Sequence, residues 1–219
     1  MKINHIIPAT GFEYLEAPQH SPEWVQIRVG RKTSSRMADW IGRGVKGQFL
    51  KPHFDYEREL AFEKQFNVPF SRFVSEAMDE GTNQENFIKG QYTEITGREI
   101  APAGAFYDKD SASSPDGFVG DDGLVECKWL WDTKFSEVLD NGVLPEHQIQ
   151  MQDQLRCSGR QWVDYVVANG NSKKIKIIRV ARDEDMIKQI GDAAKEPIEG
   201  SFDTADVFDF TKAPDAVNW

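Results

Sequence analysis

The chain has 219 residues, of which 39% are hydrophobic and 11% aromatic; this composition supports a packed core and excludes an intrinsically disordered chain. There is no run of about 18 apolar residues and no N-terminal segment typical of a signal peptide, so we expect neither a transmembrane helix nor secretion. The formal net charge of −10 argues against a protein that binds nucleic acid over its whole surface.

Positive charge is concentrated in residues 26–51, and the acids lie mainly elsewhere. This segment contains one acid, Asp39, and these basic residues: Arg28, Arg31, Lys32, Arg36, Arg43, Lys46 and Lys51. A chain with one basic segment and an acidic remainder can bind DNA in a single groove, while its acidic exterior keeps DNA off the other faces.

A helix is expected to begin at Ser21, where serine, proline and an acid follow one another as at a helix N-terminus, and to end at Gly30. Thr33–Ser35 then predict the start of a second helix that reaches about Ile41. This arrangement places Arg28 near hydroxyl groups and free backbone N–H groups, which together can bind a phosphate. The alternative is that Thr33 or Ser35 only caps the helix and that Arg28 is a surface residue.

The next segments carry weaker signals. We expect an extended lead-in over 1–20, a mobile loop over 42–54, a charged surface helix over 55–66, and a short helix over 70–79 that Gly81 ends.

A further helix is predicted over 83–96 because its apolar residues recur every three or four positions, and Gly97 closes it. Glu85 lies on the same stripe as Ile88 and Tyr92. A carboxylate beside buried residues needs a partner. The alternative is an acid in the first turn that complements the helix dipole.

After an expected strand over 98–108, the segment from 113 to 129 predicts a β-hairpin with its turn at 120–123. On the second strand Leu124, Glu126 and Lys128 share one face, and the other face is wholly apolar and is expected to pack on the core. Asp116 is brought near by the hairpin. Two carboxylates and a lysine predict a divalent-metal site, although a solvated strand face and an ordinary turn are the alternative.

The remaining chain predicts a short helix over 134–139, a helix over 145–158 closed by Gly159, strands over 162–168 and 174–180, an amphipathic helix, and an acidic tail from 201. On the helix over 145–158, Gln150 and Gln154 share a face with Cys157, although glutamines on a helix usually face solvent. The order of elements predicts an α/β fold with a central mixed sheet flanked by helices and an N-terminal helical segment. We expect one domain over 1–219.

Four blocks of the sequence, in order, resemble the lambda-exonuclease-like (YqaJ) viral recombinase nucleases of the restriction-endonuclease-like PD-(D/E)XK class. The blocks are Ser21–Trp24 with Arg28–Gly30 and Thr33–Ser35; Gly81 with Glu85; Ser114–Gly117 with Glu126–Lys128; and Gln150–Gln152 with Leu155 and Gly159. Residues 43–70 match no motif of the family.

The resemblance implies a role for each matching position. Asp116, Glu126 and the backbone carbonyl of Cys127 are implied as ligands of one or two Mg²⁺ ions, for which Mn²⁺ is expected to substitute. Lys128 would position the attacking water and stabilise the transition state, Glu85 would complete the acidic pocket, and Gln150 would orient Lys128 or the water. The implied site for the DNA 5′-phosphate is formed by Arg28, Thr33 and Ser35. Met78 is the implied apolar wedge, and Asp121 and Asp122 are assigned to the turn.

The implied activity is a Mg²⁺-dependent 5′→3′ exonuclease on double-stranded DNA ends that releases 5′-mononucleotides and leaves a 3′ single strand. Members of the family are homotrimers that serve phage-type recombination beside a single-strand annealing protein. The resemblance therefore implies a cytoplasmic protein of a bacterial host, with phage or prophage origin.

Two other functions remain open on the sequence: a structure- or sequence-specific endonuclease on the same core, and a non-catalytic DNA-end-binding module. An iron–sulfur nuclease is excluded because the chain has only Cys127 and Cys157.

Overall fold

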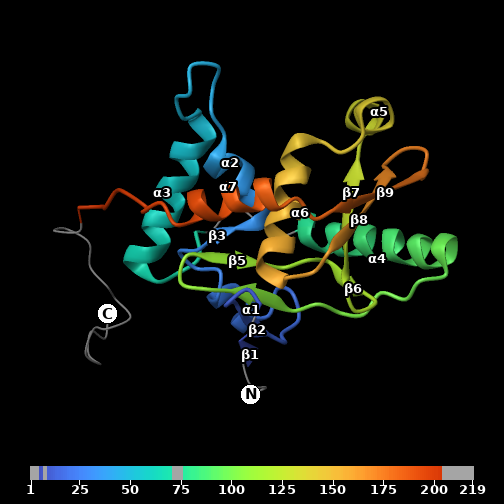
Figure 1. The fold of residues 1–219 in the computed structure, drawn as a ribbon, viewed down its shortest axis with the longest axis horizontal. Helices are drawn as coiled ribbons and strands as arrows, with labels where there is room; N and C mark the ends of the chain where they lie inside the picture. The colour runs from blue at the N-terminus through green and yellow to red at the C-terminus, as the bar shows by residue number, and fades with distance from the viewer. Residues whose placement is uncertain (1–4, 7–8, 71–75, 204–219) are drawn as a thin grey trace, which may run out of the picture.

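The computed structural model in Figure 1 describes residues 5–6, 9–70 and 76–203, and the side chains of 5–6 and 76–82 lie outside the description. Within these ranges the chain forms two β-sheets with helices between and around them. No helix in the described part is long and apolar enough to cross a membrane. The expected acidic tail falls outside the described residues beyond 203.

The strands divide into a small sheet and a larger one. The small sheet has the order β1 (His5–Ile6), β2 (Glu13–Leu15), β4 (Ala105–Tyr107), β5 (Ser111–Ser113) and β3 (Lys32–Thr33). The larger sheet has the order β6 (Gly117–Val119), β7 (Gly123–Leu130), β8 (Trp162–Asn169) and β9 (Ile175–Ala181). Both sheets are mixed, because β3 runs parallel to β5 and β7 runs parallel to β8.

The helices come from both halves of the chain. They are α1 (Pro22–Gln26), the 3₁₀ helix η1 (Ser34–Arg36), α2 (Met37–Ile41), α3 (Lys51–Phe66), α4 (Glu76–Thr96), α5 (Asp132–Asn141), α6 (Pro145–Ser158) and α7 (Glu184–Ala194).

The predicted hairpin is confirmed as β6 and β7, with Gly117 opposite Val125 and Gly123 opposite Val119. Strand β7 then pairs in parallel with β8 over eight residues, from Gly123 opposite Trp162 to Leu130 opposite Asn169. Parallel strands need a crossover connection, and α5 and α6 supply it.

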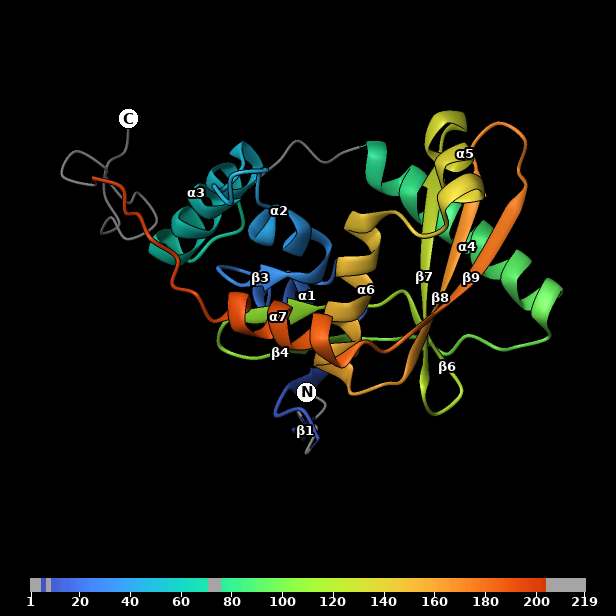
Figure 2. The same ribbon diagram turned by 45° about the horizontal axis from the view of Figure 1, so that its top comes forward.

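Helices cover both faces of the larger sheet (Figure 2). On one face Val125 and Val166 pack with Ile88 and Tyr92 of α4, which confirms the predicted apolar face. The other face carries a second core formed by sheet and crossover residues: Leu124, Val163, Val167, Met151, Leu155, Phe135 and Val138. The face that holds Glu126 is therefore also covered, and the polar groups on it need protein partners.

The helices α2, α3 and α7 form a separate cluster to one side, where Trp40, Tyr56, Leu60 and Ile190 are buried together. At the start of the N-terminal segment, the Ser21 hydroxyl accepts a hydrogen bond from the Trp24 N–H at 3.3 Å, as predicted for an N-cap.

Several predicted boundaries are wrong. Helix α3 begins at Lys51 instead of residue 55, because Pro52 is compatible with a first helical turn. Helix α4 continues through Gly81. One glycine costs about 1 kcal/mol in a helix, and a 21-residue helix that packs on a sheet tolerates this cost. The segment 98–108 contributes only β4, and the lead-in contains β1 and β2.

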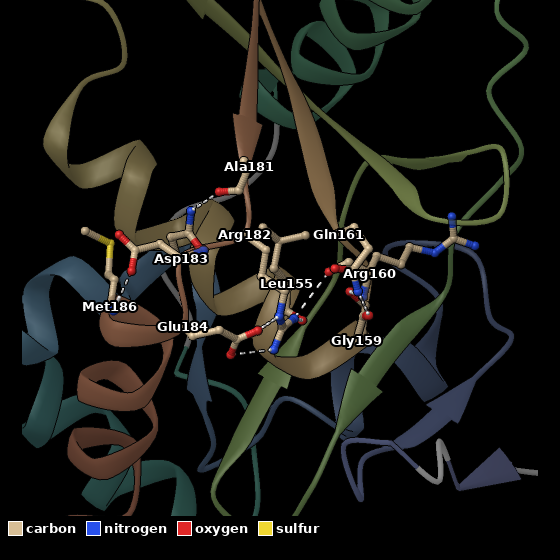
Figure 3. A network of polar contacts seen from close by, with 11 residues as sticks. Leu155, Gly159, Arg160, Gln161, Ala181, Arg182, Asp183, Glu184 and Met186 are labelled. Carbon is tan, nitrogen blue, oxygen red and sulfur yellow. Dashed lines mark hydrogen bonds and ion pairs between the residues drawn. The ribbon is translucent and has the colours of Figure 1, made fainter.

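Polar contacts fix the C-terminal half of α6 against the segment that follows β9 (Figure 3). The Arg182 guanidinium donates to the Leu155 carbonyl at 2.5 Å and to the Arg160 carbonyl at 3.2 Å. The Gln152 amide donates to the Ala181 carbonyl at 2.8 Å and accepts from the Asp183 N–H at 2.9 Å.

The other side of α6 is attached to the N-terminal segment through Asp153, whose side chain is fully buried. Its carboxylate accepts from the Ser34 hydroxyl at 2.6 Å and pairs with Arg156 at 2.7 Å. Arg156 in turn donates to the Ser111 hydroxyl of β5 at 3.0 Å. This buried cluster joins η1, α6 and the small sheet.

Replacing Asp153 with Ala leaves the Arg156 cation and the Ser34 hydroxyl without their partner. We expect the free energy of unfolding to fall by about 3–5 kcal/mol, as when one member of a buried ion pair is removed. Urea unfolding measures the change. The matched control is Asp192→Ala, whose carboxylate pairs with Lys188 in a solvent-exposed i,i+4 pair on α7 and should change the free energy of unfolding far less. Equal losses in the two variants would contradict the prediction.

Candidate active site

The β6–β7 hairpin brings the predicted acids together. Asp116 directly precedes β6, and its Oδ2 accepts a hydrogen bond from the Cys127 N–H of β7 at 2.7 Å. The Asp116 carboxylate is thereby attached to the strand that carries Glu126 and Lys128, one residue from each. The predicted hairpin geometry is confirmed at this point.

Glu126 is the most enclosed member of the cluster, with 2% of its surface exposed. Its Oε1 accepts from the Gln150 amide at 2.6 Å and lies 2.6 Å from the Lys128 Nζ. Its Oε2 accepts from the Gln154 amide at 2.6 Å. Both carboxylate oxygens therefore have partners, which a buried charge requires.

Lys128 and Gln150 complete a closed set of contacts with Glu126. The Lys128 Nζ donates to the Gln150 Oε1 at 3.0 Å, while the Gln150 amide nitrogen donates to Glu126. One glutamine thus fixes both the acid and the lysine, and its amide orientation is determined by the two contacts.

Burial and the neighbouring charges change the pKa of Asp116 and of Lys128. Burial raises the pKa of Asp116 well above its ordinary value, and the negative charges of Glu126 and Glu85 raise it further. Burial lowers the pKa of Lys128, but the neighbouring carboxylates, Glu126 first, outweigh it, and the net pKa is raised. The lysine is therefore a cation at neutral pH.

Glu85 lies on α4, on the opposite side of β7 from α6, and its charge still acts on Asp116. Its carboxylate forms an i,i+4 ion pair with Lys89 at 2.5 Å, and its side chain is 29% exposed. The structure thus brings Glu85 to the edge of the acidic cluster, where Lys89 partly neutralises it.

The oxygen donors of this cluster fit a hard divalent cation. Burial, and then repulsion from Glu126 and Glu85, raise the pKa of Asp116, and a cation bound there would oppose both effects. Mg²⁺ takes one or two carboxylates together with waters, and Asp116 and Glu126 are the carboxylates of this cluster that could hold it. Within the described residues, no group of three or more His, Cys, Asp and Glu side chains is placed to hold a metal.

Gln154 is a site residue that the sequence reasoning missed. The side chains of Gln150, Gln152 and Gln154 are all buried, although glutamines on a helix usually face solvent. The shared face of Gln150 and Gln154 was predicted from their i,i+4 spacing, but the sequence does not show that this face meets Glu126 of β7.

The predicted phosphate-binding residues are partly brought together. The Thr33 hydroxyl lies 3.5 Å from the Ser35 hydroxyl and 3.3 Å from the Tyr56 hydroxyl, and the Thr33 N–H donates to Tyr56 at 2.8 Å. The Arg28 guanidinium stacks 4.2 Å above the Trp24 ring. Burial lowers the pKa of Arg28, and the nearby Tyr56 and Glu63 oppose this effect.

Sequence reasoning also missed Tyr56 and Arg36 in this region. Burial raises the pKa of Tyr56, and its hydroxyl is within the electrostatic reach of both Arg36 and Arg28. Thr33 occupies the N-cap position of η1, as one alternative expected, but its side chain makes no cap hydrogen bond. The Trp24 indole donates to the Ser114 hydroxyl at 2.5 Å, which connects this segment to the chain just before Asp116 and β6.

Two other predictions concern Asp121 with Asp122, and Met78. Asp121 and Asp122 lie in the β6–β7 turn, as predicted. Met78 belongs to the part of α4 whose side chains lie outside those described.

Comparison with known proteins gives a family and a fold. The model of the YqaJ-like viral recombinase domain matches residues 23–161, and no curated protein matches the chain. An alkaline exonuclease (LHK-Exo) from Laribacter hongkongensis is 29% identical over 80% of this chain and 89% of its own, with a TM-score of 0.69. The same protein in complex with dAMP gives 28% identity over 80% and 89% of the two chains and a TM-score of 0.67.

A phage-related exonuclease from Haemophilus somnus is 13% identical over 75% of this chain and 90% of its own, with a TM-score of 0.59, and supports the fold alone. The predicted fold class is confirmed: a mixed α/β, restriction-endonuclease-like PD-(D/E)XK core flanked by helices.

His147 lies one turn before Gln150 on α6, and its Nδ1 is 2.5 Å from the hydroxyl of Tyr165 on β8. Burial, followed by the positive charge of Lys128, lowers the pKa of His147 to about 4. The other charges that act on the ring are those of Glu146, Glu126 and Lys134.

His147 makes stability depend on pH in a defined direction. The unfolded chain protonates it near 6.5, whereas the folded protein keeps it neutral down to about 4. The unfolded state binds more protons between these values, so the free energy of unfolding falls as the pH drops from about 6.5 toward about 4. We expect His147→Gln to remove this contribution, up to about 3 kcal/mol at the acid end. Urea unfolding of both proteins over this pH range measures it, and parallel profiles would show that the prediction is wrong.

Proposed function

The chain belongs to the family of YqaJ-like viral recombinase domains, and on this premise we propose that it is a metal-dependent deoxyribonuclease that degrades double-stranded DNA from its ends. We propose that it acts in the 5′→3′ direction, releases 5′-mononucleotides and leaves a 3′ single strand. The observation that carries the proposal is the closed contact set of Glu126, Lys128 and Gln150 beside Asp116. The similarity to an alkaline exonuclease supports the reaction class.

The chain's own residues orient and stabilise the reacting groups. Lys128 is held by Glu126 and Gln150, and as a cation it would donate to the attacking water or to a phosphate oxygen as negative charge develops there. Gln154 and Gln150 keep the Glu126 carboxylate in one orientation. Glu85 would add negative charge at the edge of the site.

Mg²⁺, with Mn²⁺ as a substitute, would be held by Asp116, Glu126 and the Cys127 carbonyl, and it would activate water and neutralise charge on the phosphate. The fixed orientation of the two carboxylates gives this proposal its support, because ligand groups that are already immobilised lose little entropy when the ion binds.

The direction of digestion is proposed to depend on the segment that contains Arg28, Thr33 and Ser35. These residues would bind the 5′-terminal phosphate, and the Tyr56 hydroxyl beside Thr33 adds a further donor. The Trp24–Ser114 hydrogen bond supports a fixed spacing between this segment and Asp116. After each cut, the new 5′-phosphate would move into the same segment.

The cellular setting is also part of the proposal. We propose a homotrimer that encloses DNA, acts beside a single-strand annealing protein in phage-type recombination, and works in the cytoplasm of a bacterial host. The concentration of basic residues in 26–51 of an acidic chain supports binding of DNA along one surface.

Removing the lysine tests the chemistry. Lys128→Ala should lower the rate of Mg²⁺-dependent digestion of an end-labelled linear duplex by about 10²–10³-fold, the loss typical of removing one preorganised donor, while DNA-end binding survives. The control is Lys134→Ala, an exposed lysine on α5, which should cut normally. Near-normal cutting by Lys128→Ala would contradict the assignment. Cleavage of a covalently closed circle by the wild type would identify an endonuclease instead.

Removing the arginine tests end recognition separately. Arg28→Ala should abolish the preference for 5′-phosphorylated over 5′-hydroxyl duplexes, because the phosphate loses its cationic partner. The ratio of initial rates on the two substrates is the measurement, and Arg58→Ala on α3 is the control. An unchanged ratio in Arg28→Ala would overturn the phosphate-binding proposal without affecting the catalytic one.

A further inference from the structure

The end of the catalytic strand carries an unusually exposed indole. Trp131 directly follows β7, and 61% of its surface is exposed. Within the described part of the chain, the next most exposed aromatic side chain among the large hydrophobic residues is Phe54, at 56%. Exposing a large apolar ring to water is unfavourable. A single exposed ring needs no explanation in general, but the contacts of this one set it apart.

Trp131 is exposed without being free to move away from the sheet. The ring lies against Gly170 in the β8–β9 turn, since a Cβ atom placed on Gly170 would lie 2.8 Å from Trp131 Cε3 and Cζ3. The Gly170 N–H donates to the Leu130 carbonyl at 2.8 Å, which joins the turn to the residue before Trp131. The absence of a side chain at Gly170 thus provides the surface on which the indole rests.

The residue after Trp131 is fixed as well. The Asp132 carboxylate accepts from the Asn169 amide at 2.8 Å and from the Asn171 amide at 2.7 Å. Strand pairing holds the chain on one side of Trp131, and these two hydrogen bonds hold it on the other. The indole is therefore a preorganised surface with one face on the protein and one face toward solvent.

The surroundings of this surface carry positive charge. Lys173, in the same turn, places its Nζ 4.1 Å from the centre of the neighbouring Trp129 ring and donates to the Gly170 carbonyl at 2.5 Å. Lys174, directly before the edge strand β9, and Lys176, on that strand, are also exposed. The Asp132 carboxylate, next to Trp131 in the chain, already accepts hydrogen bonds from the two asparagine amides. An aromatic face beside lysines is the combination that binds single-stranded nucleic acid.

The indole lies at the end of the strand that carries Lys128, three residues further along the chain. Because side chains alternate along an extended strand, Trp131 lies on the same face of the larger sheet as Trp129, and Gly170 contacts both rings. Lys128 lies on the opposite face, where it contacts Gln150 of α6. The indole is therefore a surface at the end of the sheet that is separate from the acidic cluster.

We propose that Trp131 is a stacking platform for a base of single-stranded DNA, with Lys173 and Lys174 binding the adjacent phosphates. The proposal extends the nuclease function above, because it adds a surface for single-stranded DNA outside the acidic cluster. Under this proposal, Trp131, Lys173 and Lys174 recognise single-stranded DNA.

The test measures binding without cleavage. Fluorescence anisotropy of a labelled oligo-dT strand and of a blunt duplex is recorded in EDTA for the wild type, Trp131→Ala and Trp131→Phe. We expect Trp131→Ala to weaken single-strand binding about tenfold, as for the loss of one stacked base, and to leave duplex binding within about twofold. Trp131→Phe keeps an aromatic face and should retain most of the affinity.

Leu139→Ala on α5 is the matched control, because this side chain is also apolar and exposed, at 56%, and cannot stack on a base. It should bind the single strand like the wild type. Equal single-strand affinities of wild type and Trp131→Ala overturn the proposal. The proposal is also overturned if the oligomeric mass changes in both Trp131→Ala and Leu139→Ala while their DNA affinity is unchanged. That result would identify a contact between chains.

The result is separable from the nuclease proposal. Digestion of a linear duplex in Mg²⁺ is scored in parallel with the binding experiment. If the wild type binds single strands through Trp131 and does not cut, the nuclease proposal fails and the stacking platform stands. If the wild type cuts and Trp131→Ala binds normally, the platform alone fails.

Discussion

The burial of the Glu126 carboxylate is the constraint on which the rest of the structure depends. A charge with 2% exposure is tolerated only if every oxygen is paired, and two amides of α6 with the ammonium of Lys128 provide the partners. The position of α6 is therefore critical. It is attached on one side through Asp153 to the N-terminal segment and on the other through Gln152 to the end of β9.

The same attachments relate two regions that are far apart in sequence. Ser34 lies in the segment proposed to bind the DNA end, and it contacts Asp153 of α6, which is next to Gln154, one of the two glutamines that hold Glu126. The Trp24–Ser114 hydrogen bond gives a second connection, close to Asp116. The separation between the proposed site for the DNA end and the acidic cluster is thus defined by two short polar contacts and the helix α6.

Much of the larger sheet could be predicted from the sequence, because its signals are local. The Gly120–Gly123 turn, the bounds of α6 and the alternation on β7 follow from turn chemistry and periodicity. The small sheet could not be predicted, since strands of two or three residues such as β3 form only through tertiary pairing. For the same reason, Gln154 was not assigned to the site: whether a glutamine on a helix faces water or a buried acid depends on what packs there.

The parallel pairing of β7 with β8 has a kinetic consequence. The acids and the lysine come from one local hairpin, but Gln150 and Gln154 belong to the crossover, and β8 must pair before that crossover is closed. Local contacts form early in folding, and long-range parallel pairing forms late because loop-closure entropy is lost first. During synthesis, the carboxylates would thus emerge well before the groups that orient them. The assembled site should appear only when the chain beyond residue 169 has left the ribosome, so that incomplete chains carry the acids without an ordered centre.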